Sequence, residues 1–139
     1  MNAQTRFIAY RVEESYFKVK PVKENEKFTL APKFTCSIKS GKEDFSATLT
    51  VELGDGVSVA ATPFNLKASV NGRFMLGEDV GSDRERQLRF AVNTLFPYLR
   101  SFVSFLTATS GLPPFMLPAI DVEAMIGGIR KESANTIYN

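Results

Sequence analysis

The spacing of apolar residues changes once along the chain, and this change limits the folds that the sequence can adopt. Up to about Leu76, apolar and polar residues alternate, which is typical of strands with one buried face. After Ser82, apolar residues recur every three or four positions, which is typical of a helix. For a chain of 139 residues this order predicts one α+β domain, a four-stranded antiparallel sheet over about residues 6–76 followed by helices.

Three of the predicted strands alternate regularly. Phe45–Leu53 is the clearest, and Phe34–Ile38 and Phe64–Leu76 repeat its pattern. The turn sequence around Gly41 separates the first two of these runs. The spacing predicts a meander of strands with one long excursion, which runs from about residue 21 to residue 32.

The first predicted strand is irregular. Ile8, Tyr10 and Val12 share one face, whereas Phe17 and Val19 have the opposite parity. One extra residue in a strand reverses the face of every residue that follows it. We therefore expect a β-bulge or a bend near residues 13–15.

A long helix is predicted over about residues 83–109, with Ser82 or Asp83 as its N-cap. One apolar stripe runs from Val92 through Leu95, Leu99, Phe102 and Leu106, and further stripes follow Phe96–Val103 and Ala91–Tyr98–Phe105. A helix that is apolar on nearly all sides needs cover from more than one small sheet. It either lies between two layers or packs against another copy, and a single sheet favours the second alternative. Pro97 predicts a bend or a restart within this helix.

Apolar residues also occur where connections are predicted. Phe28 and Leu30 lie in the long excursion. After Gly111, an apolar connection with three prolines carries Leu112, Phe115, Met116 and Leu117. Asp121 is expected to cap a short helix that runs to about residue 132 and has Val122, Met125, Ile126 and Ile129 among its apolar residues. Each of these residues could cap the core of its own subunit, but together they exceed the needs of a small sheet and indicate a protein-binding groove or an oligomer contact.

Composition argues against several classes of function. The chain has no histidine and a single cysteine, Cys36, which is predicted to be a small buried apolar residue. We therefore expect no catalytic residues, metal or cofactor. A net charge of +2 without a basic stripe argues against nucleic acid as a partner, and no apolar run reaches the length of a membrane span. A free thiol and a polar N-terminus predict a cytoplasmic protein.

A specific motif lies in the predicted long helix. The run Asn93-Thr94-Leu95-Phe96-Pro97-Tyr98-Leu99-Arg100, followed by residues 111–118 and by Ile120-Asp121, resembles the signature of the SecB family of protein-export chaperones. The order of four strands and two helices also resembles this family, so that the resemblance covers about residues 6–130.

The resemblance implies the fold and the activity of a holdase chaperone that uses no ATP and is not an enzyme. It implies a homotetramer, a dimer of dimers, in which the long helices are sandwiched between outer sheets and Leu95, Leu99, Phe102 and Leu106 form contacts between subunits. It also implies a groove for unfolded or precursor proteins, bounded by the long excursion and the last helix. The groove residues are, by position, Phe28, Leu30, Leu112, Phe115, Met116, Leu117, Val122, Met125, Ile126 and Ile129.

Two alternatives remain open for the further partner of the chain, the ATPase SecA and an antitoxin. SecB-like export chaperones carry an acidic sheet surface and tail that help to engage the ATPase SecA, whereas this chain is net positive and residues 131–139 hold a single acid, Glu132. Other SecB-like proteins hold the antitoxin of a toxin–antitoxin system. Outside the family, the rivals are a binding protein for a small apolar ligand and a hot-dog thioesterase. The hot-dog order of elements differs, because here the long helix follows all the strands.

Overall fold

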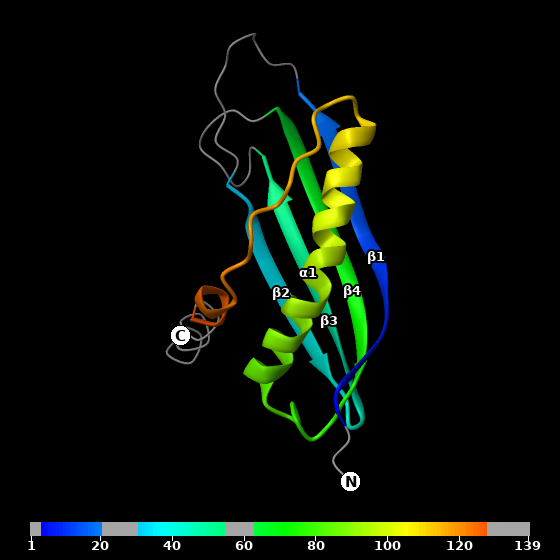
Figure 1. Cartoon of the computed structure of the whole chain (residues 1–139), viewed down its shortest axis with the longest axis vertical. Helices are drawn as coiled ribbons and strands as arrows, with labels where there is room; N and C mark the ends of the chain where they lie inside the picture. Colours follow the sequence, from blue (N-terminus) through cyan, green and yellow to red (C-terminus); the bar gives the residue numbers. More distant parts are fainter. Residues whose placement is uncertain (1–3, 21–30, 55–62, 128–139) are drawn as a thin grey trace, which may run out of the picture.

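The computed structural model describes residues 4–20, 31–54 and 63–127 (Figure 1). Its elements are β1 (Arg6–Val19), β2 (Lys33–Ser40), β3 (Asp44–Leu53), β4 (Phe64–Met75) and α1 (Arg84–Thr109). A short helical segment follows at residues 122–127. The predicted α+β architecture, four antiparallel strands followed by a long helix and a short one, is confirmed. No helix of the described residues is long and apolar enough to cross a membrane.

The sheet has the strand order β1-β4-β3-β2, and all of its pairs are antiparallel. Strands β2, β3 and β4 form a meander, and the Gly41 amide closes the first turn by donating to the Asp44 carbonyl at 2.7 Å. Strand β1 pairs with β4, so the chain crosses the whole sheet before β2 begins. The result places β1 and β2 at the two edges.

The irregular first strand contains the predicted bulge. Register shifts occur between Phe7 and Ala9 and between Val12 and Glu14. After the second shift, Phe17 pairs with Leu66 on the same face on which Val12 pairs with Val70. The change of parity in the sequence is therefore absorbed by the backbone, and Tyr10, Val12, Phe17 and Val19 share one side of the sheet.

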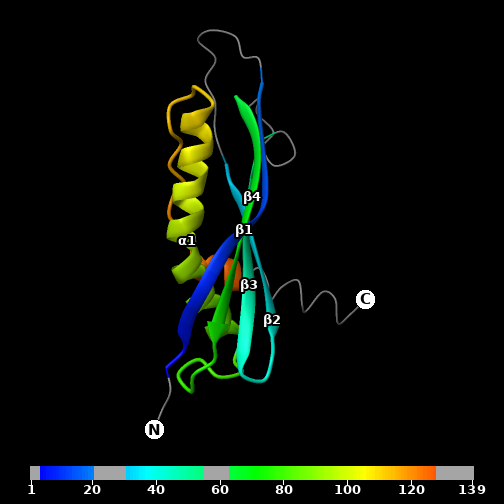
Figure 2. The same cartoon turned by 90° about the vertical axis from the view of Figure 1, so that its right-hand side faces the viewer.

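Helix α1 covers one face of the sheet and contacts all four strands (Figure 2). The core lies between these two layers, where α1 contributes Leu88, Ala91, Val92, Leu95, Leu99 and Val103. The helix comes so close to β4 that a Cβ atom added at Gly72 would lie 2.7 Å from Leu95 Cδ2. This close approach requires glycine at position 72.

Helix α1 begins as the sequence predicts. Asp83 is its N-cap and accepts hydrogen bonds from the amides of Glu85 and Arg86 at 3.0 and 3.3 Å. The helix then runs through Pro97 without interruption, so the predicted restart is wrong. Proline removes the hydrogen bond to the carbonyl of Asn93, but both residues are exposed and water can solvate that carbonyl.

The turn between β4 and α1 is fastened to both edges of the sheet, at the start of β1 and at the end of β2. Asp79 Oδ1 accepts from the amide and from the hydroxyl of Thr5 at 2.9 and 2.8 Å, and the Thr5 hydroxyl oxygen accepts from the Gly77 amide at 2.9 Å. The buried Gln87 amide accepts from the Ser40 hydroxyl and donates to the Gly81 carbonyl, both at 2.8 Å. These bonds fix the direction in which α1 leaves the sheet.

After α1, the chain returns along the helix toward β2 (Figure 1). The Phe115 amide donates to Thr107 Oγ1 at 2.8 Å, and the Ser104 hydroxyl donates to the Phe115 carbonyl at 3.0 Å. Further on, Arg89 forms an ion pair with Glu123 at 2.9 Å. The proline-containing connection is therefore attached to the last turns of α1 and the helical segment to its first turns.

Candidate functional site

A shallow groove of about 590 Å³ lies between the outer side of α1 and the proline-containing connection, and we call it the α1 groove. It is lined by Phe96, Pro97, Arg100, Ser101, Ser104 and Met116. Met116 has 56 % of its surface exposed, although its sulfur accepts a hydrogen bond from the Ser104 hydroxyl at 3.2 Å. The groove thus combines open apolar surface with hydroxyl groups and one cation.

The apolar residues predicted for a groove divide into two sets. Leu112, Phe115, Val122 and Met125 are partly buried and pack against the core, and Met116 stays exposed in the α1 groove. Leu117 and Ile126 are fully buried members of the core, so their assignment to an open groove is wrong. The physical reason is that two adjacent residues of an extended chain point in opposite directions, so Leu117 turns inward where Met116 turns outward. Phe28, Leu30 and Ile129 lie outside the described residues.

The four residues predicted for contacts between subunits also divide. The prediction is wrong for Leu95 and Leu99, because these side chains face the sheet and are fully buried within the subunit. Phe102 and Leu106 lie at the side of the buried stripe, partly buried, and keep some surface. The sequence identified an apolar stripe, but a helix with several stripes does not show which of them faces its own sheet.

Exposed apolar side chains that the sequence did not single out lie on β1 and on α1, which meet at Tyr10 and Tyr98. These side chains, called here the lateral apolar surface, are Ile8, Tyr10, Val12, Tyr98 and Phe105, with exposed fractions from 38 to 60 %. The rings of Tyr10 and Tyr98 join the two elements, with centroids 4.2 Å apart. The stripe that contains Tyr98 and Phe105 and the apolar parity of Ile8, Tyr10 and Val12 were the available signals. The sequence could not show that these side chains are exposed, because their exposure depends on the position of β1 at the edge of the sheet.

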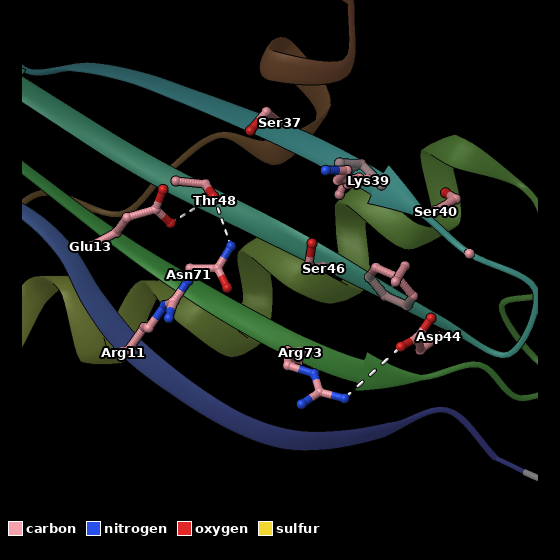
Figure 3. Close-up of a pocket in the computed structure, with 13 residues that line it drawn as sticks. Arg11, Glu13, Ser37, Lys39, Ser40, Asp44, Ser46, Thr48, Asn71 and Arg73 are labelled. Atoms are coloured by element: carbon pink, nitrogen blue, oxygen red, sulfur yellow. Dashed lines mark hydrogen bonds and ion pairs between the residues drawn. The ribbon is translucent and has the colours of Figure 1, made fainter.

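The opposite face of the sheet is polar and open. It forms a wide depression of about 770 Å³, lined from all four strands by residues that include Arg11, Arg73, Lys39 and Asn71 (Figure 3). Basic residues outnumber acidic ones among the outward positions of the four strands, where Arg6, Arg11, Lys18, Lys33, Lys39, Lys67 and Arg73 stand against Glu13, Glu14, Asp44 and Glu52. The described sheet surface therefore lacks the acidic character that the family resemblance implied.

The single thiol of the chain is held in its protonated form. Cys36 lies on the inner face of β2, and burial raises the pKa of its thiol to about 12, so the thiol stays protonated at neutral pH. No group of three or more acidic or sulfur side chains of the described residues could hold a metal ion.

Comparison with known proteins decides the family. Residues 22–131 match the family model of SecB, the preprotein translocase subunit. The chain belongs to the SecB family. It is also 30 % identical over 132 residues to an uncharacterized protein of Methanocaldococcus jannaschii, with 91 % of this chain and 84 % of that protein covered.

Relatives named as protein-export protein SecB match over shorter stretches. The protein of Ehrlichia canis is 38 % identical over 64 residues, which cover 46 % of this chain and 34 % of the relative. The protein of Anaplasma marginale is 32 % identical over 100 residues, which cover 58 % of this chain and 57 % of the relative. The match thus spans from a third to just over half of the length of these SecB proteins.

Among solved structures, the fold is similar to that of a SecB-like chaperone of Mycobacterium tuberculosis in complex with a ChAD peptide from an antitoxin. The TM-score is 0.64 at 18 % identity, with 84 % of this chain and 91 % of that chain covered. A protein of unknown function from Streptococcus agalactiae has a TM-score of 0.54 at 8 % identity, with 84 % of this chain and 98 % of that chain covered. At identities this low, the similarity shows a shared fold and nothing further.

Proposed function

We propose that this protein is an ATP-independent holdase chaperone that binds unfolded polypeptide segments on the helix side of the sheet. Membership of the SecB family supports a chaperone role. The observation that carries the more specific proposal is the α1 groove, where Met116 and Pro97 remain exposed although the core beside them is closed. Phe115, Val122 and Met125, in the connection and the helical segment that follow α1, also keep partly exposed apolar side chains.

Binding by this groove follows from burial of apolar surface. Each large apolar side chain of a client that becomes covered contributes about 1.5–3 kcal/mol, and association and ordering offset much of the sum. Micromolar affinity, about −8 kcal/mol, is the expected result for one groove. The flexible thioether of Met116 suits clients of varied sequence.

A homotetramer, arranged as a dimer of dimers, is part of the proposal. The lateral apolar surface supports it, because exposed aromatic and branched side chains on an edge strand and a neighbouring helix are typical of contacts between copies. Several grooves on one oligomer raise the effective concentration for a long unfolded client. We place this assembly in the cytoplasm, and we propose neither catalysis nor a cofactor for it.

The clients are proposed to be unfolded precursor proteins, with an antitoxin as the alternative. SecB-named relatives favour export, and the fold neighbour solved with an antitoxin peptide favours the alternative. The described outer sheet face, which is not acidic, argues against docking of SecA. A pull-down with purified SecA separates the two, since retention of SecA supports export and its absence supports the antitoxin role.

The holdase activity is tested with carboxamidomethylated α-lactalbumin, a permanently unfolded probe. We expect the full chain to bind this probe without nucleotide, and Met116→Asp to weaken binding about tenfold because it places a charge in the groove. Met116→Leu is the matched control and should keep binding within about twofold. Absence of binding by the unaltered chain, or equal binding by Met116→Asp, contradicts the proposal. A fixed small mass retained in native mass spectrometry supports a binding protein for a small apolar ligand instead.

A further inference from the structure

The polar face of the sheet, opposite α1, has the chemistry of a second binding surface. Two neighbouring rows of outward side chains cross its four strands. The register places Arg11, Asn71, Thr48 and Ser37 in one row and Ala9, Arg73, Ser46 and Lys39 in the next. Apart from Ala9, every member is a cation or a hydrogen-bonding group, so the depression in Figure 3 favours a polar partner.

The charges in this depression are unevenly engaged. Asp44 lies 4.0 Å from the Arg73 guanidinium, and Glu13 accepts a hydrogen bond from the Thr48 hydroxyl at 3.4 Å. The side chains of Arg11 and Lys39 are exposed and have no ion pair or hydrogen bond within the described part of the chain. Both carboxylates thus have neighbours that moderate their charge, while two of the three cations have no such neighbour among the described residues.

We propose that this face docks an acidic polypeptide segment of a partner protein, independently of the α1 groove on the other side. Its carboxylates would pair with Arg11, Arg73 and Lys39, and its backbone would meet the hydroxyl and amide groups between them. Arg73 and Lys39 are two strands apart, about 10 Å across the sheet. In a segment of polyproline II conformation, which has three residues per turn and rises about 3.1 Å per residue, acidic residues three positions apart lie on the same side and about 9 Å apart, which matches the two cations.

The weak ion pair of Arg73 does not prevent this docking. Its guanidinium and the Asp44 carboxylate are at least half exposed, and solvent-exposed pairs of this kind contribute little to stability. An incoming carboxylate can therefore replace Asp44. Because the face is solvent-exposed, docking must also weaken as salt increases.

The test is fluorescence anisotropy with a labelled peptide of repeated Glu-Ser-Gly units, titrated with the full chain at about 50 mM salt, where the screening length is about 14 Å. We expect saturable binding that weakens at least about fivefold at about 200 mM salt, and no binding of the Lys-Ser-Gly counterpart. The double variant Arg11→Glu/Lys39→Glu should lose at least about tenfold in affinity.

A matched control removes the effect of total charge. Lys18→Glu/Lys33→Glu changes the same number of charges on the same strands and face, but at the opposite end of the sheet. It should lose less than about twofold, since these lysines lie six or more residues along their strands, about 20 Å, from Arg11 and Lys39, which is more than a screening length. Equal losses in both double variants, or no binding of the acidic peptide, overturn the proposal. So does tighter binding of a thymidine oligonucleotide of equal charge, which would make this a nucleic-acid surface.

This result is separable from the holdase activity. The Arg11→Glu/Lys39→Glu variant should still bind carboxamidomethylated α-lactalbumin, because both substitutions lie on the face away from α1. If that variant loses both activities, the two surfaces are not independent and the proposal fails.

Discussion

Gln87 shows how one buried polar side chain directs a whole helix. It is 1 % exposed, and its amide satisfies both the Ser40 hydroxyl and the Gly81 carbonyl. Its carbonyl and NH₂ groups join the end of β2 to the turn before α1. A residue of similar size without these groups would leave both partners unsatisfied in a partly buried place.

We therefore expect Gln87→Met to lower the free energy of unfolding by about 1–3 kcal/mol. Urea denaturation followed by circular dichroism measures the change. Asn93→Ala, at an exposed position of the same helix, is the control and should stay within about 0.5 kcal/mol of the unaltered chain. A loss no larger than that of the control would mean that water replaces the bonds of Gln87.

Asp79 makes the free energy of unfolding depend on pH in the acidic range. The hydroxyl and the amide of Thr5 donate to its carboxylate and hold the pKa of Asp79 below its ordinary value of 3.8. A depressed pKa in the folded state stabilises the protein at any pH above the pKa of the unfolded chain. This contribution is lost as the pH falls through the lower, folded pKa.

The midpoint of urea unfolding should therefore be insensitive to Asp79 titration above about pH 5 and decline below about pH 4. Asp79→Asn should flatten this acid limb, because the amide does not titrate. The measurement is a series of urea curves between about pH 2.5 and 7. The same acid limb in Asp79→Asn as in the unaltered chain would assign it to other carboxylates.

The packing of α1 on β4 depends on a position without a side chain. A Cβ atom at Gly72 would lie 2.7 Å from Leu95 Cδ2 and 3.1 Å from the Phe74 ring, so one of them must move. We expect Gly72→Ala to destabilise the fold by about 1–3 kcal/mol. Gly127→Ala is the matched control, because no atom of the described residues other than those of its chain neighbours lies within 4 Å of a Cβ at that position. Thermal unfolding of the two variants compares them, and equal midpoints would show that α1 shifts without cost.

The elements were predictable because their signals are local. The alternation in Phe45–Leu53 gave β3, the change of parity around Glu13 gave the bulge in β1, and Asp83 marked the start of α1. These signals depend on neighbours in the sequence. Of the bend or restart predicted at Pro97, the restart is wrong, because the exposure of that turn to water depends on the tertiary structure.

The candidate site was less predictable, because it depends on which apolar stripe of α1 is covered by the sheet and which stays exposed. Leu95 and Leu99 look equivalent to Phe102 in the sequence, yet the sheet lies under the first two. Likewise, nothing local distinguishes Leu117 from Met116. The basic outer face required the register of four strands, since Arg11, Arg73 and Lys39 come from three of them.

The assembly of subunits is testable through the lateral apolar surface. Phe105 is 60 % exposed, and a charge at this position would be buried without a partner in any contact between copies. We expect Phe105→Glu to reduce the proposed tetramer to smaller species at micromolar concentration, as measured by size-exclusion chromatography with light scattering. Asn93→Glu is the control, because it adds the same charge about 120° around the helix and should leave the mass unchanged. A monomeric unaltered chain, or a Phe105→Glu tetramer, contradicts this role of the surface.

The two edges of the sheet differ in a way that bears on how far association can proceed. Strand β1 offers Ile8, Tyr10 and Val12 along its length, whereas β2 carries Lys33 and Lys39 on its exposed rim. Lysines on a free edge act as gatekeepers that discourage further strand addition. Self-association through β1 would be isologous, because two copies related by a twofold axis cover each other's β1 edge. Growth along the sheet then stops at a pair, and the proposed tetramer requires two such pairs to meet through another surface, so a chain rich in exposed apolar residues avoids becoming a filament.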